Sequence, residues 1–166
     1  MIMKTKHLIF ALCTATVLTS CLLESNNQYA PTIACGNIIN NHGDTLKLRT
    51  DDKNDYYWLD TMHVGDTAQF VFFFTGYEND LVSTEISTDA NYTKLDMLLV
   101  QEIRDIMLET SDTTRGLLNF KPGYNAVQFA SHYIALKEGT PSMFVSVHTD
   151  SKFSPTEFEI RTPIVP

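Results

Sequence analysis

Three consecutive aromatic residues, Tyr56, Tyr57 and Trp58, carry the most evident binding chemistry in the chain. Successive side chains of a β-strand point to opposite faces, so we expect Tyr56 and Trp58 to share one face and Tyr57 to lie on the other. Flat rings on an exposed face stack on sugar rings, which would make this segment a ligand-binding site. A large aromatic is equally an ordinary core residue of a β-sandwich. We favour the core interpretation for Trp58 and keep carbohydrate binding as the alternative.

Catalytic and metal-binding patterns are weak. Ser131 and His132 are adjacent, but adjacent strand residues point apart and cannot form a hydrogen-bonded dyad. The histidines show no His-x-x-x-His spacing, and the acidic segment 51–55 lacks the glycine and the distal glutamate of a calcium loop. We therefore expect no enzyme activity, no metal and no cofactor.

Four Asp-Thr pairs are the second group of candidate residues. They place threonines at Thr45, Thr61, Thr67 and Thr113. The pattern resembles a short O-glycosylation motif of some exported bacterial proteins, and that resemblance implies glycan attachment at these threonines. Asp-Thr is also common turn chemistry, so both interpretations stay open.

The N-terminal segment differs in character from the rest of the chain. Lys4 and Lys6 precede an apolar run over 8–18, which is about 11 residues, whereas a helix needs about 20 to span a bilayer. This length is typical of the core of a signal peptide. The run ends in Leu18-Thr19-Ser20-Cys21.

That ending resembles the lipobox of bacterial lipoproteins. The resemblance implies that residues 1–20 are removed, that the Cys21 thiol becomes lipidated, and that 21–30 form a tether. Leu22 after the cysteine, rather than aspartate, implies the outer membrane. Several acyl chains on one residue hold a domain at a membrane, since one chain alone anchors only marginally. The alternative is an ordinary signal peptide followed by a structural thiol.

Size and charge limit the kinds of partner. Removing residues 1–20 leaves a chain the size of one domain, which we place at 31–166. Lys4 and Lys6 leave with that segment, so the net charge moves from −8 to −10. Such an acidic surface argues against a nucleic-acid partner.

Cysteine usage gives no disulfide framework. Of the three cysteines, Cys13 leaves with the signal and Cys21 would be acylated, so Cys35 remains alone. A domain held together by disulfides would have an even set. We expect Cys35 to be a small, buried or half-buried apolar residue.

Short alternating segments separated by frequent turns predict the fold. Alternation runs through 67–75, 142–149 and 156–162, and turns at this spacing are typical of a sandwich or barrel. Residues 93–109 differ, because leucine and isoleucine recur there at helical spacing. We predict a strand that leads into one short helix near 99–108.

One stretch resembles a known module. Residues 60–88 comprise a strand, the turn Val64-Gly65-Asp66-Thr67, an aromatic strand and an acidic loop into another strand. This pattern resembles the start of a bacterial Ig-like module, over 56–162 in outline. The resemblance implies an all-β, Ig-like antiparallel β-sandwich without a shared active site.

With these features, the chain resembles the envelope lipoproteins of Gram-negative bacteria. We expect a protein anchored in the outer membrane through Cys21, with a non-catalytic binding, adhesion or assembly role towards a protein or glycan. The alternative is a carbohydrate-binding accessory protein that uses Tyr56, Tyr57 and Trp58. A hydrolytic enzyme is the third hypothesis.

Overall fold

The computed structural model describes residues 29–50 and 55–166. The signal peptide, Cys21 and most of the tether predicted from the sequence therefore lie outside the described residues. No helix among the described residues is long and apolar enough to cross a membrane. The described elements are β1 (Thr32–Cys35), β2 (Ile38–Asn40), β3 (Thr45–Leu46), β4 (Leu48–Thr50), β5 (Tyr56–Leu59), β6 (Met62–His63), β7 (Thr67–Thr75), β8 (Leu81–Thr88), β9 (Thr93–Leu98), α2 (Gln101–Ile106), β10 (Leu117–Asn119), β11 (Ala126–Ala135), β12 (Ser142–Thr149), β13 (Thr156–Arg161) and β14 (Ile164–Val165).

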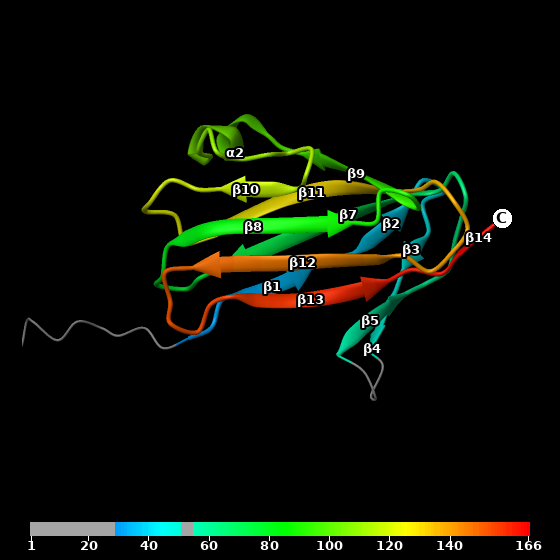
Figure 1. Ribbon diagram of the computed structural model, residues 1–166, viewed down its shortest axis with the longest axis horizontal. Coiled ribbons are helices and arrows are strands. Elements are labelled where there is room, and N and C mark those ends of the chain that lie inside the picture. Colours follow the sequence, from blue (N-terminus) through cyan, green and yellow to red (C-terminus); the bar gives the residue numbers. More distant parts are fainter. Residues whose placement is uncertain (1–28, 51–54) are drawn as a thin grey trace, which may run out of the picture.

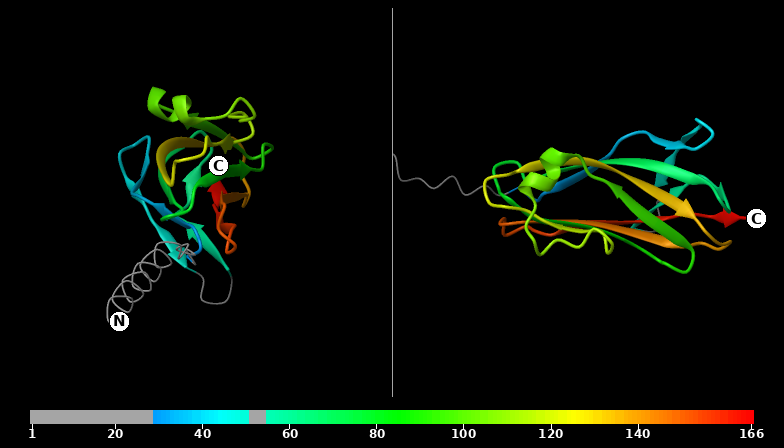
Figure 2. Two further views of the ribbon diagram at one scale, coloured as in Figure 1. Left: turned by 90° about the vertical axis from the view of Figure 1, so that its left-hand side faces the viewer. Right: turned by 90° about the horizontal axis from the view of Figure 1, so that it is seen from above.

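Two six-stranded sheets face each other (Figures 1 and 2). In the first, sheet A, the order is β3-β2-β7-β11-β9, and β1 also pairs with β7. In the second, sheet B, the order is β10-β8-β12-β13-β5-β4. The prediction of an all-β, Ig-like sandwich is confirmed.

Two strand pairs depart from the antiparallel expectation. β5 runs parallel to β13, and β6 runs parallel to β14. The chain crosses from sheet A to sheet B between β3 and β4, forms the antiparallel β4–β5 pair in sheet B, and returns to sheet A in β7. As a result, β5 enters sheet B in the same direction as β13, far from it in sequence.

The core lies between the sheets, and β7 shows why the sequence folds this way. Its alternate residues Ala68, Phe70, Phe72 and Phe74 are fully buried, while Phe73 points to the opposite face and is 42% exposed. The inward rings pack on one another, with 5.5 Å between the ring centroids of Phe70 and Phe72. Burying large aromatics is the main favourable term for such a core.

Residues 93–109, where the sequence predicts a strand and a short helix, form β9 followed by the six-residue helix α2, so that prediction is confirmed. α2 buries none of its residues, and a helix this short is unstable alone. Lys121 fixes its C-terminal end, because its backbone N–H donates to the Ile106 carbonyl at 2.9 Å and its Nζ donates to the Asp105 carbonyl at 2.5 Å.

Candidate functional site

The three predicted aromatics are split between the two faces of sheet B. Tyr57 is level with the fully buried Ile160 in the β5–β13 register, so it lies on the core side. Its ring packs edge-on against Phe158, with centroids 5.5 Å apart. Tyr56 and Trp58 lie together on the outer face, as the strand alternation predicts.

Trp58 is half-buried and is not part of the core, which makes the core interpretation wrong. The alternation along β5 directs Leu59, only 2% exposed, into the core instead. The indole packs edge-to-face with Tyr56 at 5.4 Å and an interplanar angle of 79°. Because the two rings are nearly perpendicular, they do not form a coplanar platform.

A charged pair covers part of this aromatic face. The Arg161 guanidinium lies 3.8 Å from the centroid of the Tyr56 ring, and its Nε donates to Glu159 Oε1 at 2.7 Å. The Ser142 hydroxyl donates to the same oxygen. The bond from Arg161 holds the pKa of Glu159 below its ordinary value, and Glu159 in turn raises the pKa of Arg161. Arg161 thus occupies one face of the Tyr56 ring.

A shallow hollow of about 520 Å³ lies at one end of the same outer face. Four hydroxyl residues, Ser87, Thr88, Thr140 and Ser142, contribute to its lining. The rings of Tyr92 and Phe144 and the carboxylate of Asp89 complete the polar and aromatic surface. Phe144 is 54% exposed. Hydroxyls, a carboxylate and rings are groups that can contact a sugar.

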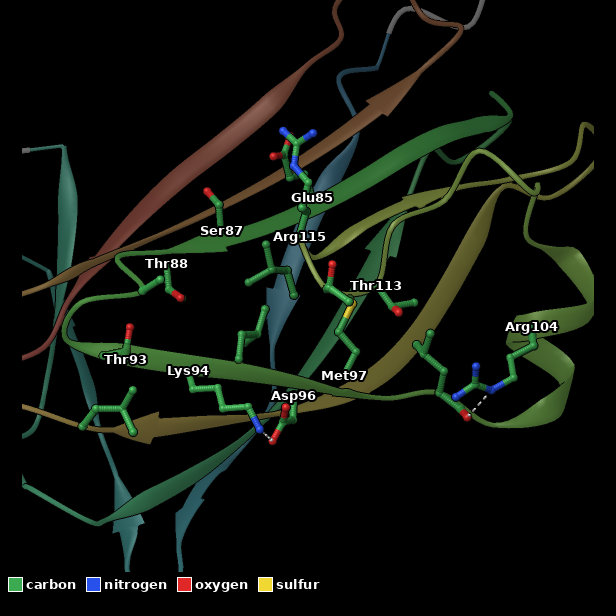
Figure 3. Close-up of a pocket in the computed structure, with 16 residues that line it drawn as sticks. Glu85, Ser87, Thr88, Thr93, Lys94, Asp96, Met97, Arg104, Thr113 and Arg115 are labelled. Atoms are coloured by element: carbon green, nitrogen blue, oxygen red, sulfur yellow. Dashed lines mark hydrogen bonds and ion pairs between the residues drawn. The ribbon is translucent and has the colours of Figure 1, made fainter.

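The larger hollow, about 680 Å³, lies where the two sheets separate between β8 and β9 (Figure 3). We call it the β8–β9 groove. β8 carries Glu85, Ser87 and Thr88 on one wall, and β9 carries Thr93, Lys94, Asp96 and Met97 on the other. Thr113 lies between the walls, the Arg115 guanidinium lies beside Glu85 at β8, and Arg104 of α2 lies at one end.

The groove combines an apolar floor with a charged rim. Ile86, Leu95, Met97 and Leu99 supply the apolar side chains. On the rim, Lys94 forms an ion pair with Asp96 at 2.9 Å. Arg104 and Arg115 are exposed, and the lining holds one further carboxylate, that of Glu85. Asp112, outside the lining, attracts Arg115, so positive and negative side chains are mixed around the groove.

One side of the groove is an open strand edge. β9 pairs with β11 over its whole length, and no strand among the described residues pairs with its other edge. β8 pairs with the short strand β10 only over Ser83–Glu85, and its C-terminal residues Ile86, Ser87 and Thr88 border the groove. A free edge presents backbone N–H and C=O groups that can pair with another chain.

Gly116 brings the 111–116 loop against β8 beside the groove. Its φ is 75°, and a Cβ added there would lie 1.9 Å from the Ile86 carbonyl oxygen. This close approach allows the Ile86 N–H to donate to the Gly116 carbonyl at 3.0 Å. Only glycine fits the site without a rearrangement.

Aspartates of the Asp-Thr pairs accept hydrogen bonds that stabilise turns and loops. Asp66 accepts the His63 N–H at 2.8 Å, and Asp60 accepts the Lys47 N–H at 3.0 Å. Asp112 accepts the Thr114 N–H and hydroxyl. These are turn and loop hydrogen bonds, which accounts for the recurrence of aspartate.

The threonines of these pairs differ in access. Thr45 and Thr61 are exposed, whereas Thr67 and Thr113 are half-buried. A glycan at Thr113 would stand in the β8–β9 groove, which Thr113 lines.

The remaining candidates lie apart from one another. Ser131 is fully buried, while His132 is half-exposed on the outer face of sheet A, level with Asp96. Within 29–50 and 55–166, no group of three histidine, cysteine or acidic residues could hold a metal ion. Cys35 is free and packs against the edge of the core, and burial raises the pKa of its thiol to about 11. The prediction of a half-buried filler is confirmed.

The sequence pointed to the aromatics but missed the groove. Its lining comes from β8, β9, α2 and a loop, and no local motif links these segments. The one usable signal was the alternation of Thr93, Leu95 and Met97, which marks a strand, although it says nothing about which edge stays free.

Comparisons with known proteins add only distant structural likenesses. No family model matches the sequence, and no curated protein does. A family 123 glycoside hydrolase from Clostridium perfringens aligns with a TM-score of 0.38 and 13% identity, over 82% of this chain and 27% of that one. A chain described as BspA_C_mut aligns at 0.41 and 11% identity, over 80% of this chain and 46% of that one.

A PapD-like domain of human CEP192 aligns with a TM-score of 0.36 and 14% identity, over 72% of this chain and 84% of that one. All three scores are low. This chain spans about a quarter and about half of the first two chains' lengths.

Proposed function

We propose that this chain is an outer-membrane lipoprotein, lipidated at Cys21, whose sandwich is a non-catalytic assembly module. The module binds an extended peptide segment of a partner protein along the free edge of β9. The observation that carries this proposal is the open β9 edge beside the β8–β9 groove. Backbone pairing supplies affinity in this mode of recognition, and pockets for alternate side chains supply specificity.

The groove suits such a segment chemically. Every second side chain of an added strand would point towards the apolar floor formed by Leu95 and Met97. The exposed guanidinium groups of Arg104 and Arg115 favour a segment that carries carboxylates. The net charge of the mature chain, which moves from −8 to −10 when Lys4 and Lys6 are removed, would otherwise repel an acidic partner.

A peptide-display selection on the detergent-solubilised mature protein tests this function. Arg115→Trp places a bulky ring at the groove and removes a charge, while Val64→Trp, at an exposed position outside the groove lining, is the control for the introduced ring. We expect the selected peptides to bind native protein and the control equally and to lose affinity for Arg115→Trp. They should also slow amide hydrogen exchange at Leu95 and Met97. Equal binding to all three proteins would place the site elsewhere.

Lipidation is tested separately by Cys21→Ser. Metabolic labelling with a radioactive fatty acid should label the native protein in the membrane fraction, whereas the variant should be unlabelled and released. Label retained by Cys21→Ser would contradict the anchor.

Carbohydrate binding is the second candidate, because Trp58 and Tyr56 lie on the outer face of sheet B near the hydroxyl-lined hollow. A glycan array tests it with the native protein, Trp58→Ala and the control Tyr57→Phe, because Tyr57 is 36% exposed but lies on the opposite face of β5. Binding that is lost only in Trp58→Ala would support a glycan ligand. An array with no signal would leave the peptide proposal as the better account.

O-glycosylation is a further possibility at the exposed Thr45 and Thr61. Intact-mass measurement of the native protein, compared with Thr45→Ala and Thr61→Ala, detects it directly. An intact mass equal to that of the polypeptide plus its lipid would rule out modification.

A further inference from the structure

Exposed aromatic rings gather at one end of the sandwich. Tyr29, Tyr77, Tyr124 and Phe153 are 68%, 45%, 42% and 45% exposed, respectively. They come from the start of the described chain and from the β7–β8, β10–β11 and β12–β13 loops, which all lie at the end opposite the C-terminus (Figure 1). We call these four residues the tip. Loops at the surface are usually polar, so four large rings at one end need an explanation.

The β7–β8 loop places the Tyr77 ring outward through a strained backbone conformation at Tyr77. Tyr77 has φ 60°, in the left-handed region, which costs about 1–2 kcal/mol for a residue other than glycine. Thr75 Oγ1 accepts the Tyr77 N–H at 3.0 Å, and the Asn125 side-chain amide donates to the Tyr77 carbonyl. The ring then packs against Tyr29, with centroids 5.7 Å apart. Glycine or asparagine would satisfy this turn more cheaply, so the ring has a role beyond folding.

The proposed lipid anchor places the membrane at this end, and the inference rests on that part of the proposed function. Eight residue steps separate Cys21 from Tyr29, and a fully extended chain covers about 28 Å in that length. β11 alone has ten residues, which span about 33 Å. The tip is therefore the end of the sandwich that a tether from Cys21 brings nearest to the bilayer.

Charges at the tip are mixed. Lys121 and Lys152 lie in these loops beside Glu78, Asp80 and Asp150. The Lys152 ammonium sits 5.0 Å from the centroid of the Phe153 ring, and Asp80 accepts the Gly123 N–H. With no excess of positive charge, attraction to anionic lipid is not the driving force. Tyrosine and phenylalanine rings instead suit the interface between headgroups and acyl chains, where one side is apolar and the other is wet.

We propose that the tip rests in the bilayer interface and that its four rings insert beside the acyl chains of Cys21. The acyl chains supply the anchoring, and the rings fix the orientation of the sandwich. The C-terminal end then points away from the membrane, and the β8–β9 groove opens sideways above it.

A tryptophan reporter tests this orientation in the lipidated full-length product. In a Trp58→Phe background, Phe153→Trp places the single indole at the tip, and Val64→Trp places it at the opposite end as the matched control. Each protein is reconstituted into zwitterionic phosphatidylcholine vesicles with brominated acyl chains. We expect Phe153→Trp emission to shift to the blue and lose intensity through bromine quenching, whereas Val64→Trp emission stays unchanged.

A second variant shows whether the neighbouring rings are required. Tyr77→Ser with Tyr124→Ser should abolish the quenching at Phe153→Trp while the protein still floats with the vesicles. Flotation without quenching of Phe153→Trp overturns the tip proposal and leaves the lipid anchor intact. A shift that requires anionic lipid also overturns it, in favour of electrostatic contact. A native protein that fails to float contradicts the lipidation at Cys21, on which the tip proposal rests.

Discussion

Gly116→Ala should destabilise the sandwich by about 2–4 kcal/mol. A left-handed φ of 75° costs an alanine about 1–2 kcal/mol, partly offset by about 0.4–1 kcal/mol from the reduced freedom of the unfolded chain. The larger effect comes from the new Cβ, which would lie 1.9 Å from the Ile86 carbonyl oxygen. Relief of that overlap separates the loop from β8 and breaks the 3.0 Å bond from the Ile86 N–H. A buried N–H left unpaired costs about 1–3 kcal/mol.

Gly65→Ala is the matched control for this change. Gly65 also has a positive φ, 94°, but a Cβ there would have no heavy atom within 4 Å. It therefore reports the backbone cost alone, about 1 kcal/mol. Urea unfolding followed by circular dichroism measures the free energy of unfolding of both variants. In a thermal melt, the melting temperature of Gly116→Ala should fall by about 8–15 °C. Equal losses in the two variants would refute the argument that contact with β8 makes glycine necessary.

Three further predictions concern single side chains. Because the pKa of the Cys35 thiol is about 11, its reaction with a disulfide reagent at pH 8 should be much slower than that of a free cysteine and should become fast in denaturant; rapid labelling of the folded protein would contradict its burial. The pKa of Asp66 is lowered in the folded protein, mainly because its carboxylate accepts the His63 N–H. The ionised Asp66 therefore stabilises the folded state above the ordinary aspartate pKa of 3.8, and this stabilisation is lost as the pH falls through the lower folded pKa. Asp66→Asn should weaken the dependence of unfolding on acidic pH, and an unchanged pH profile would argue against this role. Trp58→Ala should cost less than the about 3–5 kcal/mol typical of a buried large aromatic, whereas Phe72→Ala should cost that amount, as measured by urea unfolding; equal costs would restore the core interpretation of Trp58.

The parts of the fold that follow from local pattern were predictable. Alternation fixes which residues of β7 enter the core, because the side-chain period of a strand is two. The same rule separates Tyr57 from Tyr56 and Trp58. It cannot say which face of β5 is buried, since both faces of that short strand carry rings. That choice depends on the pairing with β13, and so the core interpretation of Trp58 was wrong.

The candidate groove depends on contacts between distant segments and was outside the reach of local reasoning. Nothing near Leu95 or Met97 in the sequence indicates that one edge of β9 lacks a neighbour. The close approach of Gly116 to Ile86 spans thirty positions and is specified by tertiary packing alone. The tip is similar, because its four rings come from separate parts of the chain.

The parallel pairing of β5 with β13 has a consequence for the order of folding. β13 is the strand that connects the β4–β5 hairpin to the rest of sheet B, and it begins at Thr156, far along the chain from the end of β5 at Leu59. Until residues 156–161 are available, β4 and β5 have only each other as partners, and an isolated two-stranded hairpin is marginal in water. A nascent chain therefore cannot complete this sheet early. Sheet B closes only when β13 has been synthesised and pairs with β5.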